Sequence, residues 1–166
     1  MHGQLAVEWI ERLVDDPDEP LLLAGRAHHL RRWELPRADY PQGRAGYLKW
    51  RRDQKARHAT DVAAILSPCG YSPDEIERVQ RLIRREAIDG TSAVEDAACL
   101  VFIETQLAGL TERMDHALLV DVIRKTARKM TPEALGFVAD IPLGDQARNV
   151  LTEALQNGSN DLRRNH

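Results

Sequence analysis

The chain has 166 residues, of which 43% are hydrophobic and 30% are charged. This is the balance of an ordinary soluble globular protein, long enough to bury one full core. No stretch approaches the roughly 20 apolar residues that a membrane span needs, so we do not expect a membrane protein. The two cysteines, Cys69 and Cys99, have no paired spacing, and we expect a reduced, cytoplasmic protein.

The net charge of −3 conceals a basic segment. Residues 26–58 contain ten basic and three acidic side chains, an excess of seven positive charges. A local positive field in an acidic protein favours a small anionic or phosphorylated ligand, whereas the rest of the surface would repel duplex nucleic acid. A solvated helix face is the alternative interpretation. The sequence leaves the oligomeric state open, a homodimer included.

Helical periodicity dominates, and we expect an all-α fold. The predicted helices cover residues 4–15, 18–34, 44–66, 91–110, 114–129 and 145–156, with a short one near residue 131. Another helix opens at Ser72, which forms a predicted capping box with Glu75. Prolines and a glycine make residues 35–43 a loop. We expect a single helical domain over residues 1–157 and a polar, disordered tail over residues 158–166.

Four polar residues stand in helical segments that are otherwise apolar: His29, Asp53, His58 and Asp96. Imidazole and carboxylate groups are common ligands of divalent metals, so we predict that these four form a metal site. Asp96 lies on a row of core-facing residues at helical spacing. An ionised carboxylate there needs a metal or a cation to compensate its burial, and a salt bridge to arginine is the alternative.

The other three residues have structural alternatives as well. An inward histidine such as His58 is often a hydrogen-bonded core residue. Asp53 has the spacing of an i,i+4 ion pair with Arg57. On an ideal helix His28 points about 100° away from His29, so we expect only one of the two to face the site.

Further polar residues complete the predicted site. Glu95 and Glu104 join Asp53 and His58 as candidate catalytic groups, with surface acids as the alternative for the two glutamates. The side chains predicted to bind phosphate are Arg32, Arg44, Lys49, Arg52 and Lys125. Four aromatic residues could stack on a base or pack in the core: Trp33, Tyr40, Tyr47 and Trp50.

Three segments carry a resemblance: "RAHHLRRWELPRADYPQGRAGYLKWRRDQKARHA", "GYSPDEIERVQRLI" and "EDAACLVFIE". They resemble a bacterial family known as domain of unknown function 4202, over about residues 4–156. This resemblance implies no activity.

A more distant resemblance is to the HD-domain superfamily of metal-dependent phosphohydrolases. In that superfamily a His on one helix is followed by a His-Asp pair on the next helix and by an Asp on a later one. His29 matches the first His, and "WRRD" places Asp53 on the Asp of the pair. The run "GYSPDEIERVQRLI…EDAACL" is similar to the segment that carries the last ligand, which places Asp96 there.

The chain departs from this pattern at Arg52, which stands where the pair has its His and cannot bind a metal. His58 follows Asp53 by five residues and is the expected replacement. On an ideal helix the two side chains point about 140° apart, so they meet at one ion only if they flank it or the helix bends. The alternative is that the metal is lost and Arg52 holds an anion.

The HD resemblance implies an HD-like fold and hydrolysis of a nucleotide or another small phosphorylated metabolite. The implied cofactor is a divalent metal, with Mn, Fe, Zn, Ni, Co and Mg as candidates. One alternative is a catalytically inactive HD-like module that binds an anionic small ligand or a protein partner. Another is an HD-like iron oxygenase.

Overall fold

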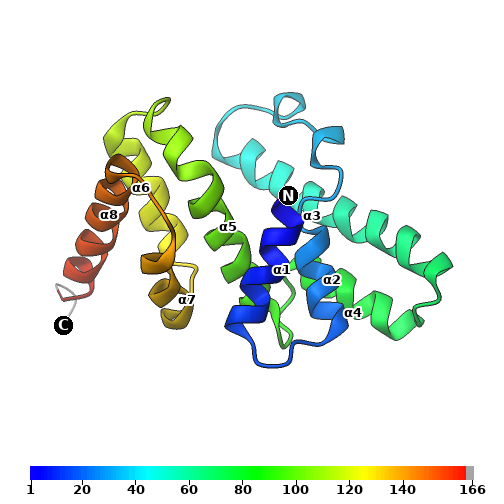
Figure 1. Cartoon of the computed structure of the whole chain (residues 1–166). Coiled ribbons are helices and arrows are strands. Elements are labelled where there is room, and N and C mark those ends of the chain that lie inside the picture. Colours follow the sequence, from blue (N-terminus) through cyan, green and yellow to red (C-terminus); the bar gives the residue numbers. More distant parts are fainter. Residues whose placement is uncertain (164–166) are drawn as a thin grey trace. The chain divides into compact units, whose positions relative to one another are not determined.

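The structure, a computed structural model, describes the backbone of residues 1–163 and the side chains of residues 1–156. This part of the chain is helical and has no strand, which confirms the all-α prediction (Figure 1). It forms two compact units, Met1–Ala98 and Cys99–His166, and the boundary falls within one helix. The single domain expected over residues 1–157 stays a prediction. No helix of the described residues is long and apolar enough to cross a membrane.

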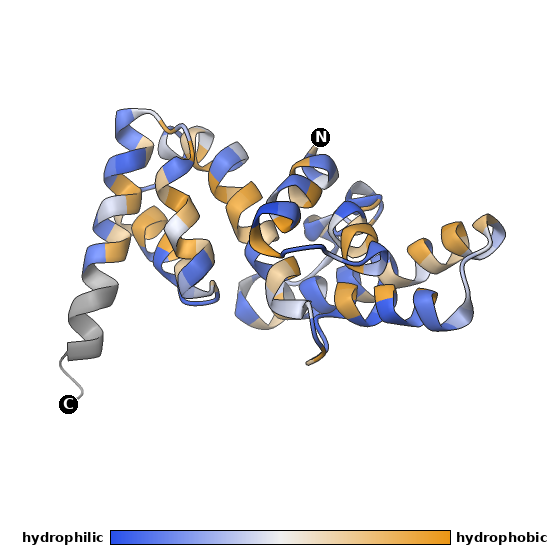
Figure 2. Cartoon of the chain, turned by 60° about the horizontal axis from the view of Figure 1, so that its bottom comes forward, coloured by the Kyte–Doolittle hydropathy of each residue, from blue (hydrophilic) through white to orange (hydrophobic). Residues whose placement is uncertain are grey.

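Unit 1 contains the first four α-helices and the start of the fifth. Their bounds are α1 His2–Leu13, α2 Glu19–Ala27, α3 Gly43–Leu66, α4 Pro73–Arg84 and α5 Thr91–Thr111. Short 3-10 helices occupy Arg32–Glu34, Arg37–Asp39 and Ser67–Cys69. Helix α2 packs on α1 and on α4, and α4 packs on α3. Hydrophobic and polar residues alternate around these helices, as amphipathic packing requires (Figure 2).

Unit 2 continues with the rest of α5 and three further α-helices. These are α6 His116–Ala127, α7 Pro132–Phe137 and α8 Asp145–Arg163, with a 3-10 helix at Val138–Asp140 between the last two. Helix α8 packs on α6. It continues past residue 156, where the sequence predicts its end, and the predicted tail over residues 158–166 therefore begins inside this helix. Residues 164–166 of that tail lie outside the described residues.

Side-chain caps fix the starts of several helices. The Ser72 hydroxyl accepts from the Glu75 amide, and the Glu75 carboxylate accepts from the Ser72 amide, so the predicted capping box is confirmed. Asp18 caps α2 by accepting from the Leu21 amide at 3.0 Å. These caps satisfy amides that lack partners within the helix.

The loop before α3 is held against that helix at a single glycine. Gly46 is buried, and a Cβ added there would collide with the backbone carbonyl of Pro41. The indole Nε1 of Trp50 donates to the Leu35 carbonyl at 2.9 Å, one helical turn further along. Because glycine has no side chain, the loop can lie directly on α3 at position 46.

We expect Gly46→Ala to destabilise the fold by about 1–3 kcal/mol, because the new methyl group meets backbone rather than a flexible side chain. Gly136→Ala in α7 is the matched control, since nothing lies within 4 Å of its added Cβ. Alanine there should leave stability unchanged or raise it by up to about 1 kcal/mol. Urea unfolding of both variants measures the difference, and equal midpoints would contradict this account of Gly46.

Candidate functional site

The chain leaves α2 earlier than the sequence pattern predicts. The helix ends at Ala27 rather than near residue 34, and the Leu30 amide donates to the Ala27 carbonyl in a tight turn. Arg31 then adopts a left-handed conformation with φ of 48°. His28 and His29 therefore lie in a turn, and their ring centroids are 4.2 Å apart. The angle of about 100° between them, which applies to a continuous helix, therefore does not hold here, and the expectation that only one of them faces the site stays a prediction.

The His28 ring is oriented by the backbone of α2. Its Nδ1 lies 2.7 Å from the Gly25 carbonyl, and only 8% of the residue is exposed. Burial lowers the pKa of His28 to about 4, so the ring is neutral at physiological pH. A carbonyl can only accept, so Nδ1 carries the proton and Nε2 carries the lone pair. That Nε2 is buried and has no hydrogen-bond partner.

His58 offers a second nitrogen of the same kind. It is 3% exposed and lies on the buried face of α3 with Trp50, Gln54 and Val62. Burial lowers its pKa, while a hydrogen bond to the Leu30 carbonyl acts in the opposite direction. Nδ1 of this ring is buried without a partner. The ring nitrogen that serves the carbonyl must carry the proton, so Nδ1 is the bare acceptor.

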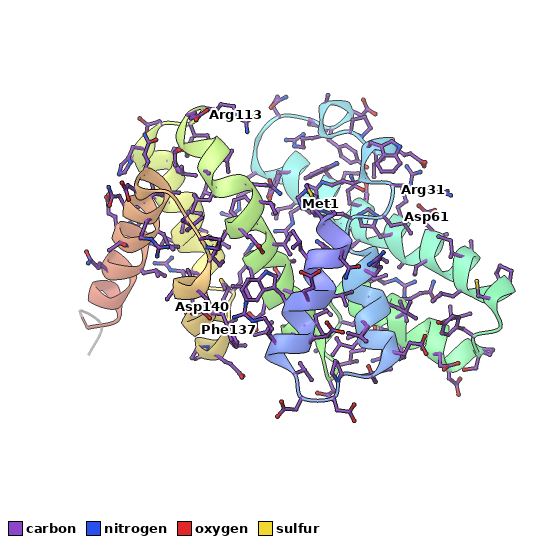
Figure 3. The ribbon with its side chains drawn as sticks, viewed as in Figure 1. Met1, Arg31, Asp61, Arg113, Phe137 and Asp140 are labelled. Carbon is purple, nitrogen blue, oxygen red and sulfur yellow. The ribbon has the colours of Figure 1, made fainter. Side chains whose placement is uncertain are left out.

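His29 differs from His28 and His58 because its Nε2 already has a hydrogen-bond partner. Nε2 lies 3.2 Å from the Arg32 guanidinium, and because arginine can only donate, this nitrogen accepts. Burial, together with the neighbouring His28 and Arg32, lowers the pKa of His29 to about 3. The His2 ring at the start of α1 lies edge-on at 5.4 Å. Met1 and Arg31, labelled in Figure 3, mark the two chain segments that bring these rings together.

We call His2, His28, His29 and His58 the histidine centre. The positive charge of Arg85 acts on His28 and helps to lower its pKa. Arg85 also donates to Glu95 of α5 at 2.9 Å. Burial opposes the charge on Glu95, but Arg85 outweighs it and the pKa of Glu95 falls below its usual value. Glu95, predicted as a candidate catalytic group, is thus an ionised partner of Arg85.

Asp96 follows Glu95 on α5 and is 2% exposed. Four other residues of its predicted core-facing row are buried as well: Ala93, Leu100, Ile103 and Leu107. The inward direction read from the helical spacing is therefore confirmed. The carboxylate takes part in polar interactions within the structure.

Asp53 faces a different environment from His58. Its carboxylate accepts from the Tyr40 hydroxyl at 3.0 Å and from Lys49 Nζ at 2.5 Å, and Arg52 lies 3.5 Å away. Lys49 is the main reason that the pKa of Asp53 falls below its usual value. Arg57, the predicted alternative partner of Asp53, forms ion pairs with Glu34 and Asp61 instead.

The predicted phosphate-binding residues are distributed over both units. In unit 1, Arg32 adjoins the histidine centre, whereas Arg44, Lys49 and Arg52 have exposed side chains. In unit 2, the exposed Lys125 forms an ion pair with Asp121 at 2.5 Å, and Glu104 lies on α5. Within the described residues, no group of three or more His, Cys, Asp or Glu side chains lies close enough together to hold a metal ion.

Comparison with known proteins identifies one matching family. The family model described as "Domain of unknown function (DUF4202)" matches residues 1–151. The chain belongs to the DUF4202 family. No curated protein and no solved structure matches it.

The sequence alone did not indicate two further residues of this site, Gln54 and Arg85. Gln54 is 3% exposed and donates to the carbonyls of Arg32 and Leu35 at 3.0 and 2.8 Å, which fixes the turn beside the histidine centre. It lies four residues before His58, so the helical spacing could have revealed it. Arg85 has a positive φ of 62° at the end of α4, and nothing in the sequence signals that position.

We expect this DUF4202 protein to lose stability as the pH falls below about 6.5. His28 binds a proton near pH 6.5 when unfolded but only near pH 4 when folded, so the unfolded chain gains protons first. Each such histidine lowers stability by about 1.4 kcal/mol per pH unit in that window. Urea unfolding between pH 7.5 and 5 measures the slope, and His28→Gln should make it shallower. An unchanged slope in that variant would contradict the neutral, buried ring.

Proposed function

We propose that this DUF4202 chain is an HD-like, metal-dependent phosphohydrolase acting on a nucleotide or another small phosphorylated metabolite. The observation that carries the proposal is the pair of bare nitrogens, His28 Nε2 and His58 Nδ1. Each is buried on a neutral ring whose other nitrogen is tied to a backbone carbonyl. Histidines that bind metals usually have this second hydrogen bond, which fixes both the tautomer and the orientation of the ring.

The proposed ligands are side chains of the types that bind divalent cations, and Asp53 is not among them. His28 and His58 would supply imidazole nitrogens, and the buried Asp96 would supply a carboxylate. We assign no metal bond to His29, because its nitrogen accepts from Arg32. A bound divalent ion would lower the pKa of a water molecule and polarise a phosphoryl oxygen.

The remaining polar residues of unit 1 would prepare the site for an anion. Arg32 lies beside His29, and its guanidinium would attract a phosphate toward the centre. Glu95 stays ionised and holds Arg85 near His28, so we assign it a positioning role. We place this function in the reducing cytoplasm, as the unpaired spacing of the two cysteines predicts.

A second function has an observation in its favour. Arg32 already occupies His29 Nε2, and the described residues contain no formed group of three metal ligands. A catalytically inactive module that binds a small anion through Arg32 and its neighbours would need no metal. Metal content therefore separates the two functions.

We expect purified protein to bind Mn²⁺, Ni²⁺ or Zn²⁺ near one equivalent, as measured by elemental analysis after dialysis. His28→Gln and His58→Gln should each lower metal affinity by at least about 100-fold, since each removes one ligand. Asp53→Asn should retain the metal, because that carboxylate is engaged by Tyr40 and Lys49. His116→Gln in unit 2 controls for the loss of a histidine as such. Metal-free wild-type protein would favour the inactive module.

We expect the metal-loaded protein to hydrolyse nucleoside monophosphates or p-nitrophenyl phosphate. Asp96→Asn should lower kcat/KM by about 100-fold or more, because it removes the charge that would balance the metal. Asp53→Asn should stay within about threefold of the wild type. Circular dichroism spectra of both variants separate loss of activity from loss of fold. Equal activity of the two variants would overturn the assignment of Asp96.

A further inference from the structure

Two aromatic side chains are exposed on the most basic part of the molecule. Trp33 is 76% exposed and Tyr47 is 44% exposed, whereas the other two tryptophans, Trp9 and Trp50, are buried. Single exposed apolar residues are common on protein surfaces, but exposed tryptophan beside exposed arginines is a typical composition of binding surfaces. The two residues belong to segments that the loop before α3 brings together.

Contacts with helix α3 fix the chain segment that carries Trp33. The Arg32 guanidinium lies 4.7 Å from the centre of the Trp50 ring, and the Tyr47 ring lies 6.0 Å from the same ring. Trp50 donates to the Leu35 carbonyl, and Gln54 donates to the carbonyls of Arg32 and Leu35. Trp33 lies in the chain between Arg32 and Leu35, whose carbonyls accept these hydrogen bonds. Its backbone is therefore fixed while its ring faces solvent.

Positive charge surrounds the exposed rings. Between Arg31 and Arg52 the chain has seven basic and two acidic residues, an excess of five charges in a protein whose total is −3. Arg44 is exposed at the start of α3, one helical turn before Tyr47, and the Arg51 guanidinium lies 5.9 Å from the centre of the Tyr47 ring. We call Trp33, Arg44, Tyr47 and Arg51 the aromatic–basic surface.

We propose that the aromatic–basic surface binds single-stranded nucleic acid. Arg44 and Arg51 would contact phosphates, while Trp33 and Tyr47 would stack on unpaired bases, a combination that sequence-tolerant single-strand binders use. A duplex keeps its bases inside and presents phosphates to an otherwise acidic protein, so it gains less from this surface. An acidic peptide would match the charge but leave the aromatic rings without stacking partners. This proposal is independent of the metal and of hydrolysis.

Fluorescence anisotropy of labelled 12-nucleotide single strands, measured in EDTA, tests the proposal. The wild type should bind oligouridylate or oligothymidylate, and the two probes separate RNA from DNA. Trp33→Ala should weaken binding by about 5- to 100-fold, and Trp33→Phe should restore most of it because a phenyl ring still stacks. The intrinsic fluorescence of the exposed Trp33 should be quenched on binding.

Charge variants complete the test. Arg44→Ala/Arg51→Ala should weaken binding and make its dependence on salt concentration shallower, since two phosphate contacts are lost. Arg84→Ala/Arg113→Ala removes the same charge from exposed positions outside this surface and should leave affinity within about twofold. Three results would each overturn the proposal: no binding by the wild type, equal competition by a duplex or by polyglutamate, or wild-type affinity in Trp33→Ala.

Discussion

The hydrogen bond between His28 Nδ1 and the Gly25 carbonyl is the interaction on which the histidine centre depends. It occupies a carbonyl in the last turn of α2 and fixes the ring in one tautomer. The chain then turns through the left-handed Arg31, which leaves the Leu30 carbonyl available to His58 and sets His29 against Arg32. A helix continued to residue 34 would use these carbonyls internally, and the two bare imidazole nitrogens would not form. The local end of one helix thus determines the chemistry of unit 1.

The sequence was most informative about features that depend only on local helical spacing. The all-α class, the capping box at Ser72 and the buried row through Asp96 all follow from helical spacing. It was misleading at the end of α2, because residues 28–34 have helix-compatible side chains and spacing alone does not reveal the local bond from the buried His28 ring to the Gly25 carbonyl. The placement of Asp53 shows the same limit, since the loop residue Tyr40 reaches it from 13 positions away. Helical spacing predicts the direction in which each side chain of α3 points, but it does not predict which residues of other segments that side chain contacts.

Charge in unit 1 is organised around aromatic rings rather than around ion pairs alone. Arg32 lies over Trp50, Lys49 over Tyr40 and Arg51 over Tyr47, with separations of 4.7, 5.1 and 5.9 Å. Such contacts keep guanidinium and ammonium groups near the surface without neutralising them. In the histidine centre, by contrast, burial lowers the pKa values of His28, His29 and His58 and keeps these rings neutral. Arg32 belongs to both regions, because it bonds His29 on one side and covers Trp50 on the other.

The close approach of Pro41 to Gly46 has a consequence for how this family can vary. Position 46 tolerates no side chain while the loop keeps its present path, so a larger residue there requires a loop that runs elsewhere. That loop carries the Leu35 carbonyl and the turn that Gln54 anchors. Among DUF4202 sequences, replacement of this glycine should therefore coincide with insertions or deletions between residues 35 and 42 and with loss of the indole or amide at positions 50 and 54. Joint variation of these positions would mark relatives in which the surface before α3 has been rebuilt.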